Sequence, residues 1–293
     1  MKRSRLKRIG RWILSLIVVL LLVTNVILPF GFGIFATWDK GSSVGDPPEG
    51  FQEITLTTSD DVKLAAWYAP PQNGAAIIVV HGSGNSREDV RKHIALLTEH
   101  GFGVLAIDMR GHGESDGGTN RFGWMGTQDV GAAVDYLAQQ ADVKTIGALG
   151  LSLGGEVVLG SASAYPAIKA IVSEGATYRF MDEYTALDAN SSFFRSFPTR
   201  VLTFSVGLFS GEDTPTPIME SLKAATDTHF LFIAAGKLHA ESDYGNVFVD
   251  AVGDRGELWV VPESDHIQGL KRAPDEYEQK VIGFFEANLL SQD

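Results

Sequence analysis

The sequence predicts an α/β fold with a mostly parallel sheet, preceded by one N-terminal membrane-spanning helix. Three observations lead to this prediction. A charge-free apolar run follows a basic N-terminus, short apolar segments alternate with segments of helical pattern, and Gly-rich turns follow several apolar segments. Continuous apolar strands separated by helices are typical of parallel sheets covered on both faces.

Composition limits the class of protein. The chain has 293 residues, of which 44% are hydrophobic and 20% charged, so it can bury a large core and is neither disordered nor fibrous. It contains no cysteine. Disulfides, thiolate nucleophiles and cysteine-ligated metals are therefore excluded.

Charge is distributed unevenly along the chain. Six of the 24 Lys and Arg residues lie within residues 1–11, before any acidic residue. Residues 39–293 consequently hold 18 basic against 36 acidic residues, a net charge of -18. Such a surface repels phosphate backbones, so we expect no nucleic-acid partner.

The apolar run predicts a transmembrane anchor over residues 12–35. At 1.5 Å per residue this helix is about 36 Å long, enough to cross a hydrocarbon layer of about 30 Å. Lys and Arg in residues 1–11 favour a cytoplasmic N-terminus at the cell membrane, with the rest of the chain on the outer face. A cleaved signal peptide is the alternative, although its apolar core is usually shorter and no A-x-A pattern follows.

A linker is expected over residues 36–50, which end in DKGSSVGDPPEG. The folded domain then covers residues 51–293. Its first two segments, 51–58 and 62–69, have the partial alternation of an antiparallel hairpin.

The remaining segments alternate between strand and helix. Helical patterns cover 88–100, 128–140 and 153–164, and apolar strands are expected at 75–80, 103–107, 145–149, 167–172, 230–234 and 258–261. In sheets of this kind, functional residues gather at the carboxyl ends of the strands.

The segment GLSLGG at residues 150–155 places Ser152 at such a strand end. It follows one predicted strand and opens a helix, and glycines at 150 and 154 allow a tight turn beneath an exposed hydroxyl. We interpret Ser152 as a nucleophile. An ordinary turn serine is the alternative.

A nucleophilic serine needs a base, and His266 is the best-placed histidine. It follows the last predicted strand, in the polar loop at residues 263–266. His93, His100 and His229 belong to helix or strand borders and are expected to face solvent.

The acid that orients this histidine should follow the strand at 230–234, in the predicted loop at residues 236–243. Glu241 is preferred and Asp243 is the alternative. Glu174 and Asp182, which follow the preceding strand, stay open as candidates, and a solvated loop carboxylate is the simpler explanation for each.

Two backbone amides are expected to form an oxyanion hole. One belongs to Leu153, the residue after the nucleophile, and the other to Ser83 in the Gly-rich turn HGSG at 81–84. An ordinary glycine turn is the alternative for the second.

Together these motifs resemble the α/β-hydrolase superfamily, through HGSG, DMRGHGES at 108–115, GLSLGG and SDH at 264–266. The resemblance covers about residues 51–290 and is closest to small prokaryotic dienelactone-hydrolase-like enzymes, some with a membrane segment. The resemblance implies an eight-stranded type of sheet and a short helical cap at about 176–217. It also implies that the nucleophile Ser152, the acid and then His266 follow one another along the chain, and that His112 has a structural role. The acid loop departs from the family pattern, with His239 where an aspartate is common.

These interpretations predict a carboxylesterase-like serine hydrolase that cleaves a small acyl substrate through an acyl-enzyme, with no metal or cofactor. A peptidase or amidase of the same fold is one alternative, and an inactive membrane-tethered binding protein is another. Aromatic residues of the cap either line an acyl pocket or seal the cap onto the core; they are Phe193, Phe194, Phe197, Phe204 and Phe209.

Overall fold

The computed structural model describes residues 2–180, 183–184 and 192–290. Its centre is an eight-stranded sheet in the order β10-β9-β8-β7-β4-β5-β3-β2. All neighbouring strands are parallel except that β3 pairs antiparallel with both β2 and β5. The strands are β2 (Gln52–Thr57), β3 (Lys63–Ala69), β4 (Ala75–Val80), β5 (Gly103–Ile107), β7 (Thr145–Leu151), β8 (Ile168–Glu174), β9 (His229–Ala235) and β10 (Gly256–Val261).

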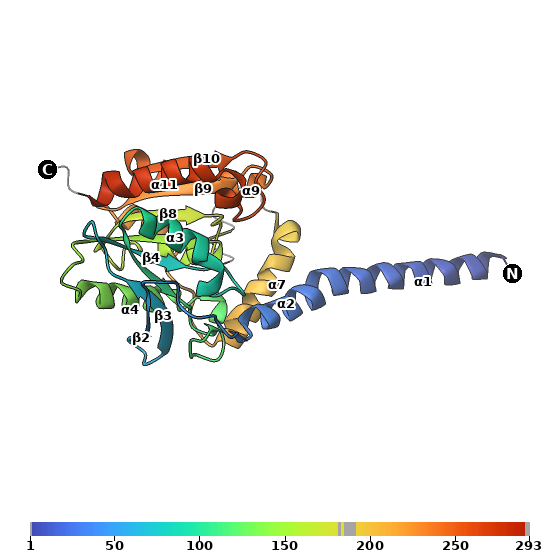
Figure 1. Cartoon of the computed structure of the whole chain (residues 1–293). Coiled ribbons are helices and arrows are strands. Elements are labelled where there is room, and N and C mark those ends of the chain that lie inside the picture. Colours follow the sequence, from blue (N-terminus) through green and yellow to red (C-terminus); the bar gives the residue numbers. More distant parts are fainter. Residues whose placement is uncertain (1, 181–182, 185–191, 291–293) are drawn as a thin grey trace.

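Helices connect the strands and cover both sides of the sheet (Figure 1). The longer ones in the globule are α3 (Arg91–Glu99), α4 (Gly126–Ala138), α5 (Leu153–Ser161), α7 (Phe193–Ser210), α8 (Ile218–Ala224), α9 (His239–Val252) and α11 (Pro274–Leu289). Shorter turns of helix occur at Arg87–Val90, Arg121–Gly123, Gly253–Arg255 and α10 (Gly269–Arg272).

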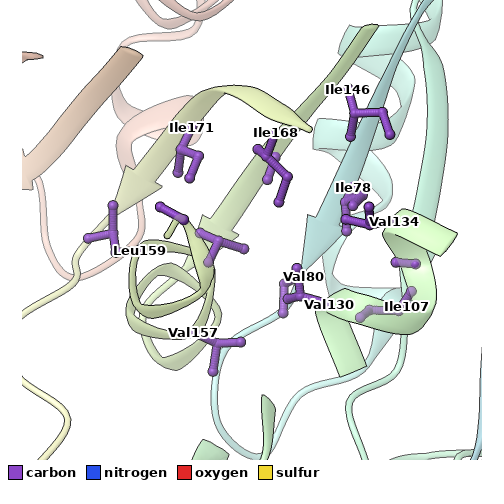
Figure 2. Packing of buried hydrophobic residues seen from close by; sticks show 14 of the residues in the cluster. Ile78, Val80, Ile107, Val130, Val134, Ile146, Val157, Leu159, Ile168 and Ile171 are labelled. Atoms are coloured by element: carbon purple, nitrogen blue, oxygen red, sulfur yellow. The ribbon is translucent and has the colours of Figure 1, made fainter. Parts of the chain in front are cut away.

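Two apolar layers form the core, one on each face of the sheet. One layer packs the sheet against α4, α5, α8 and α9, and the other packs it against α3 and α11. Figure 2 shows part of the first layer, where β-branched side chains of β4, β7 and β8 meet those of α4 and α5. β4 is buried along its whole length, which explains why its sequence is continuously apolar.

Most predicted strands lie where the sequence pattern places them. The predicted strand at 145–149 extends to Leu151, so the chain turns immediately at Ser152. One prediction is wrong: residues 239–243 were expected in a loop, but they begin α9. Polar residues in its first turn conceal the helical pattern.

The N-terminal helix runs without a break from α1 (Lys2–Leu22) through a π-helical turn (Val23–Ile27) to α2 (Leu28–Thr37). Pro29 has no N–H to donate, and the wider turn just before it lets the helix continue. Residues 7–37 form a helix long and apolar enough to cross a membrane, and α1 extends away from the globule as an isolated rod (Figure 1). A signal sequence satisfies the same criteria.

The segment after this helix is attached to the globule. Within the expected linker, β1 (Lys40–Gly41) pairs in parallel with β6 (His112–Gly113). β6 belongs to the DMRGHGES loop, so the N-terminal helix is connected directly to a loop at the carboxyl edge of the sheet.

Buried charges hold this loop in place. Arg87 is fully buried and forms ion pairs with Asp108, Glu53 and Glu114, and Asp108 is fully buried as well. The Asp108 carboxylate also accepts hydrogen bonds from the backbone N–H groups of Arg87 at 2.6 Å and Glu114 at 2.9 Å. One carboxylate thus connects the end of β5 to the loop that follows β4.

We predict that Asp108→Asn lowers the free energy of unfolding by about 3 kcal/mol, because it leaves a buried guanidinium without its buried partner. Glu53→Gln removes a half-exposed partner of the same arginine and should cost less than about 1 kcal/mol. Denaturant unfolding in detergent, followed by circular dichroism, measures both values. Equal losses would contradict the central role of Asp108.

Candidate active site

Ser152 lies at a sharp turn between β7 and α5. Its backbone has φ 51° and ψ -119°, a conformation that residues with a side chain rarely adopt. The two flanking glycines are required by close packing: a Cβ atom at Gly150 would lie 2.6 Å from the Gly155 nitrogen, and one at Gly154 would lie 2.5 Å from the His81 oxygen. The turn therefore presents the Ser152 hydroxyl at the carboxyl edge of the sheet.

His266 lies against this hydroxyl. Its Nε2 is 2.8 Å from Ser152 Oγ, although 114 residues separate the two along the chain. The backbone of Gly175, at the end of β8, allows this approach, because a Cβ atom there would lie 2.9 Å from the imidazole Cε1. The loop after β10 thus brings an imidazole to the Ser152 turn.

Glu241 completes the chain of contacts. Its Oε1 is 2.6 Å from His266 Nδ1, and its Oε2 accepts a hydrogen bond of 2.8 Å from the Ala235 N–H. The carboxylate is buried in the first turn of α9. Its hydrogen bond raises the pKa of His266 above the usual value, against the opposing effect of burial.

The other acid candidates lie elsewhere or have other partners. Asp243 is exposed to solvent on α9. Glu174 is buried and accepts hydrogen bonds from the Gly269 N–H at 2.7 Å and from Tyr277 Oη at 3.0 Å. Asp182 lies outside the described residues.

The expectation that three histidines face solvent is only partly right. His229 is exposed and His100 is partly buried beside Glu278, but His93 is buried and its ring packs edge-on against Tyr277 at 5.7 Å. His93 lies on the buried, apolar face of α3. The sequence pattern of this helix did not indicate which face the histidine occupies.

The HGSG turn lies next to Ser152. A Cβ atom at Gly82 would be 3.5 Å from Ser152 Cβ. His81 fixes this turn: its Nε2 accepts from the Met109 N–H at 3.1 Å, so its Nδ1 carries the proton and donates to the Gly82 oxygen at 2.7 Å. Burial lowers the pKa of His81 to about 4 and keeps it neutral. Sequence reasoning missed this role of His81.

His112 is buried behind the same turn. Its ring centroid lies 5.0 Å from that of His81, and its Nδ1 is 3.1 Å from the Arg110 oxygen. Burial lowers its pKa to about 3. The HGSG turn and the DMRGHGES loop are thus held together by two uncharged imidazoles as well as by the ion pair of Arg87 and Asp108.

A cavity of about 130 Å³ lies between α5 and α7, and its lining includes none of Ser152, His266 and Glu241. Glu156, one helical turn after Ser152, forms part of its wall, together with Phe122, Trp124, Phe180, Leu202 and Val206. None of the five cap phenylalanines named from the sequence lines it, and Phe193, Phe194, Phe204 and Phe209 are exposed instead. The apolar wall comes from other residues.

Glu156 is a second feature that the sequence did not reveal. Its Oε1 accepts hydrogen bonds from the Thr177 N–H at 3.3 Å and from Thr177 Oγ1 at 3.1 Å. Burial raises the pKa of Glu156 to about 7, so the cavity wall carries a carboxyl group that is partly protonated at neutral pH.

Comparison with known proteins agrees with this architecture. The family model for the alpha/beta hydrolase fold matches residues 75–226, which is half of the chain and includes Ser152. The chain belongs to this family.

Individual relatives are more distant. An uncharacterised protein of Mycobacterium tuberculosis is 33% identical over 122 residues, covering 39% of this chain and 42% of that protein. A thiohydrolase of Aspergillus aculeatus is 28% identical over 189 residues, covering 59% of this chain and 56% of its own. The chain thus matches about half the length of these curated relatives. Among solved structures, an esterase of Pyrococcus furiosus has a TM-score of 0.70 at 21% identity and covers 87% of this chain and 98% of its own.

The strained turn predicts a difference between two variants that both lack the hydroxyl. The free energy of unfolding should be about 1 kcal/mol higher for Ser152→Gly than for Ser152→Ala, because glycine adopts a positive φ without strain. The greater entropy of glycine in the unfolded state offsets part of this gain. Thermal or denaturant unfolding of the two proteins measures the difference. A more stable alanine variant would mean that the turn is unstrained.

Proposed function

We propose that this protein is a serine hydrolase in which Ser152 is the nucleophile, His266 the general base and Glu241 the orienting acid. The observation that carries the proposal is the position of the His266 imidazole, with one nitrogen at Ser152 Oγ and the other at the buried Glu241 carboxylate. In this arrangement Nδ1 holds a proton for Glu241, which leaves Nε2 free to take the serine proton.

The reaction then proceeds by acyl transfer to water. Ser152 Oγ attacks a carbonyl carbon as its proton passes to His266, and the resulting imidazolium is stabilised by Glu241. His266 returns the proton to the leaving group, and an activated water molecule releases the acyl group from Ser152. We assign the oxyanion hole to the N–H groups of Leu153, at the unpaired start of α5, and Ser83 in the adjacent turn.

The proposed substrate is a small molecule with an ester or related acyl bond, and no metal or organic cofactor takes part. The thiohydrolase relative favours thioesters as a second substrate type, since the same acyl-enzyme forms from either bond. Peptidase or amidase chemistry uses the same residues, and an inactive membrane-tethered binding protein keeps only the fold. The contacts of His266 favour an active enzyme over the last alternative.

We further propose that the N-terminal helix anchors the protein in the cell membrane. Residues 1–11 would then lie in the cytoplasm and the hydrolase domain on the outer face, because basic residues precede the apolar helix. No nucleic-acid partner is proposed for so acidic a domain.

Replacing the proposed nucleophile should abolish activity. We expect Ser152→Ala to lower turnover of p-nitrophenyl butyrate by about 10⁴-fold or more and to eliminate labelling by a fluorophosphonate probe. Ser163→Ala, which removes a half-buried hydroxyl just beyond the other end of α5, should keep both. A wild-type protein that neither turns over esters and thioesters nor reacts with the probe would favour the binding-protein alternative.

Replacing the proposed acid should change both the rate and its pH dependence. Glu241→Gln should lower kcat by about 10³- to 10⁴-fold, because an amide no longer holds the imidazole in the required tautomer. Since Glu241 raises the pKa of His266, and the base must be neutral, the residual activity of this variant should begin to rise at a lower pH than in the wild type. Asp243→Asn, on the exposed side of α9, should leave kcat and its pH dependence unchanged. A large loss of kcat in Asp243→Asn with little loss in Glu241→Gln would show that Asp243 is the acid.

A further inference from the structure

The outer face of α7 is unusually apolar for the surface of this globule. Among the described residues after Trp38, seven large hydrophobic side chains are exposed, and five of them lie on α7. The exposed fractions reach 85% for Phe194 and 65% for Phe204. We call these five the α7 patch: Phe193, Phe194, Phe204, Leu208 and Phe209. An apolar patch concentrated on one helix marks an interaction surface.

The charge of α7 differs from that of the rest of the globule. Its only charged residues are Arg195 and Arg200, whereas residues 39–293 as a whole carry twice as many acidic as basic residues. The Arg200 guanidinium lies 5.7 Å from the centroid of the Phe193 ring, so the helix carries a positive group next to the apolar patch. Basic amphipathic helices with exposed aromatic residues are suited to lipid head groups and the acyl chains beneath them.

The α7 patch is continuous with the helix that is suited to cross a membrane. Ser205 Oγ donates a hydrogen bond of 2.8 Å to the Phe30 oxygen in α2, and the rings of Phe30 and Phe209 meet edge to face at 5.8 Å. The two helices approach closely because residue 33 is glycine: a Cβ atom there would lie 2.5 Å from Ser205 Oγ. Exposed Phe32 and Phe35 on α2 continue the apolar surface.

The arrangement of the two helices matches a membrane surface. Residues 12–37 form a helix about 39 Å long at 1.5 Å per residue, which exceeds a hydrocarbon layer of about 30 Å. Measured from Trp12, the α7 contacts at Phe30 and Gly33 lie about 27 and about 32 Å along this helix, at the far boundary of such a layer. In Figure 1, α7 runs across the direction of α1, on the side of the globule from which the N-terminal helix leaves.

We propose that the α7 patch lies in the head-group and acyl-chain boundary of the same membrane that α1 and α2 cross. The helix then serves as a second membrane contact, which fixes the orientation of the globule on the lipid surface. This proposal depends on the N-terminal helix being retained in the membrane, and it does not depend on the chemistry proposed for Ser152.

The absence of cysteine allows a direct test with the full-length protein. Single cysteines replace Phe204 and Leu208 in the patch, Phe32 on α2 as the membrane reference, and Val260 as the control. Val260 is also an exposed apolar residue, but it lies on β10. Each variant is labelled with an NBD fluorophore and reconstituted into vesicles of phosphatidylcholine and phosphatidylglycerol. Quenching by spin-labelled lipids is compared with quenching by aqueous iodide, after circular dichroism has verified the fold.

We expect labels at positions 204 and 208 to emit at shorter wavelength than the label at 260, and to be quenched by lipid spin labels severalfold more strongly. Their lipid quenching should approach that at position 32. Labels at 204 and 208 that iodide quenches as strongly as at 260 would overturn the proposal. Labels at 204 and 208 that are shielded from both quenchers would also overturn it, because they would indicate that a second copy of the chain covers the patch. A label at position 32 that lipids do not quench would overturn it as well.

Discussion

The candidate site depends on one buried carboxylate. Glu241 accepts the Ala235 N–H with one oxygen and contacts His266 Nδ1 with the other, so it connects the end of β9 to the loop after β10. Burying a carboxylate is costly unless its oxygens are hydrogen-bonded, and both oxygens of Glu241 are. The same contacts that offset this cost also fix the imidazole that faces Ser152.

The loops around this chain of contacts are held by further buried polar groups. Arg87 and Asp108 connect the segments after β4 and β5, and neutral His81 ties the HGSG turn to Met109. The HGSG turn lies next to Ser152, whose own backbone has a positive φ. Strain of this kind persists only where neighbouring packing leaves the turn no alternative, and here the glycines at 150 and 154 are packed against backbone atoms.

The cap helix α7 has two faces with different surroundings. Leu202 and Val206 point to the cavity beside Glu156, whereas Phe204 and Leu208 are exposed. The helix also contacts α2, and β1 joins the segment after α2 to the DMRGHGES loop. The N-terminal helix is thus connected to the helix that lines the cavity and to the DMRGHGES loop, so its position in a membrane would determine where the cavity lies relative to the lipid.

Local sequence pattern determined much of this protein. Continuous apolar runs identified the strands of the sheet, and a serine between glycines after one of them identified the turn at Ser152, because burial on both faces and tight turns restrict residue types locally. The position of His266 after the last strand followed from the same alternation. Only the tertiary structure distinguished Glu241 from Asp243, because the first turn of α9 buries one and exposes the other. It also decided that four of the five phenylalanines of α7 are exposed, since the face a helix buries depends on packing partners distant in sequence, here α2 and the cavity wall.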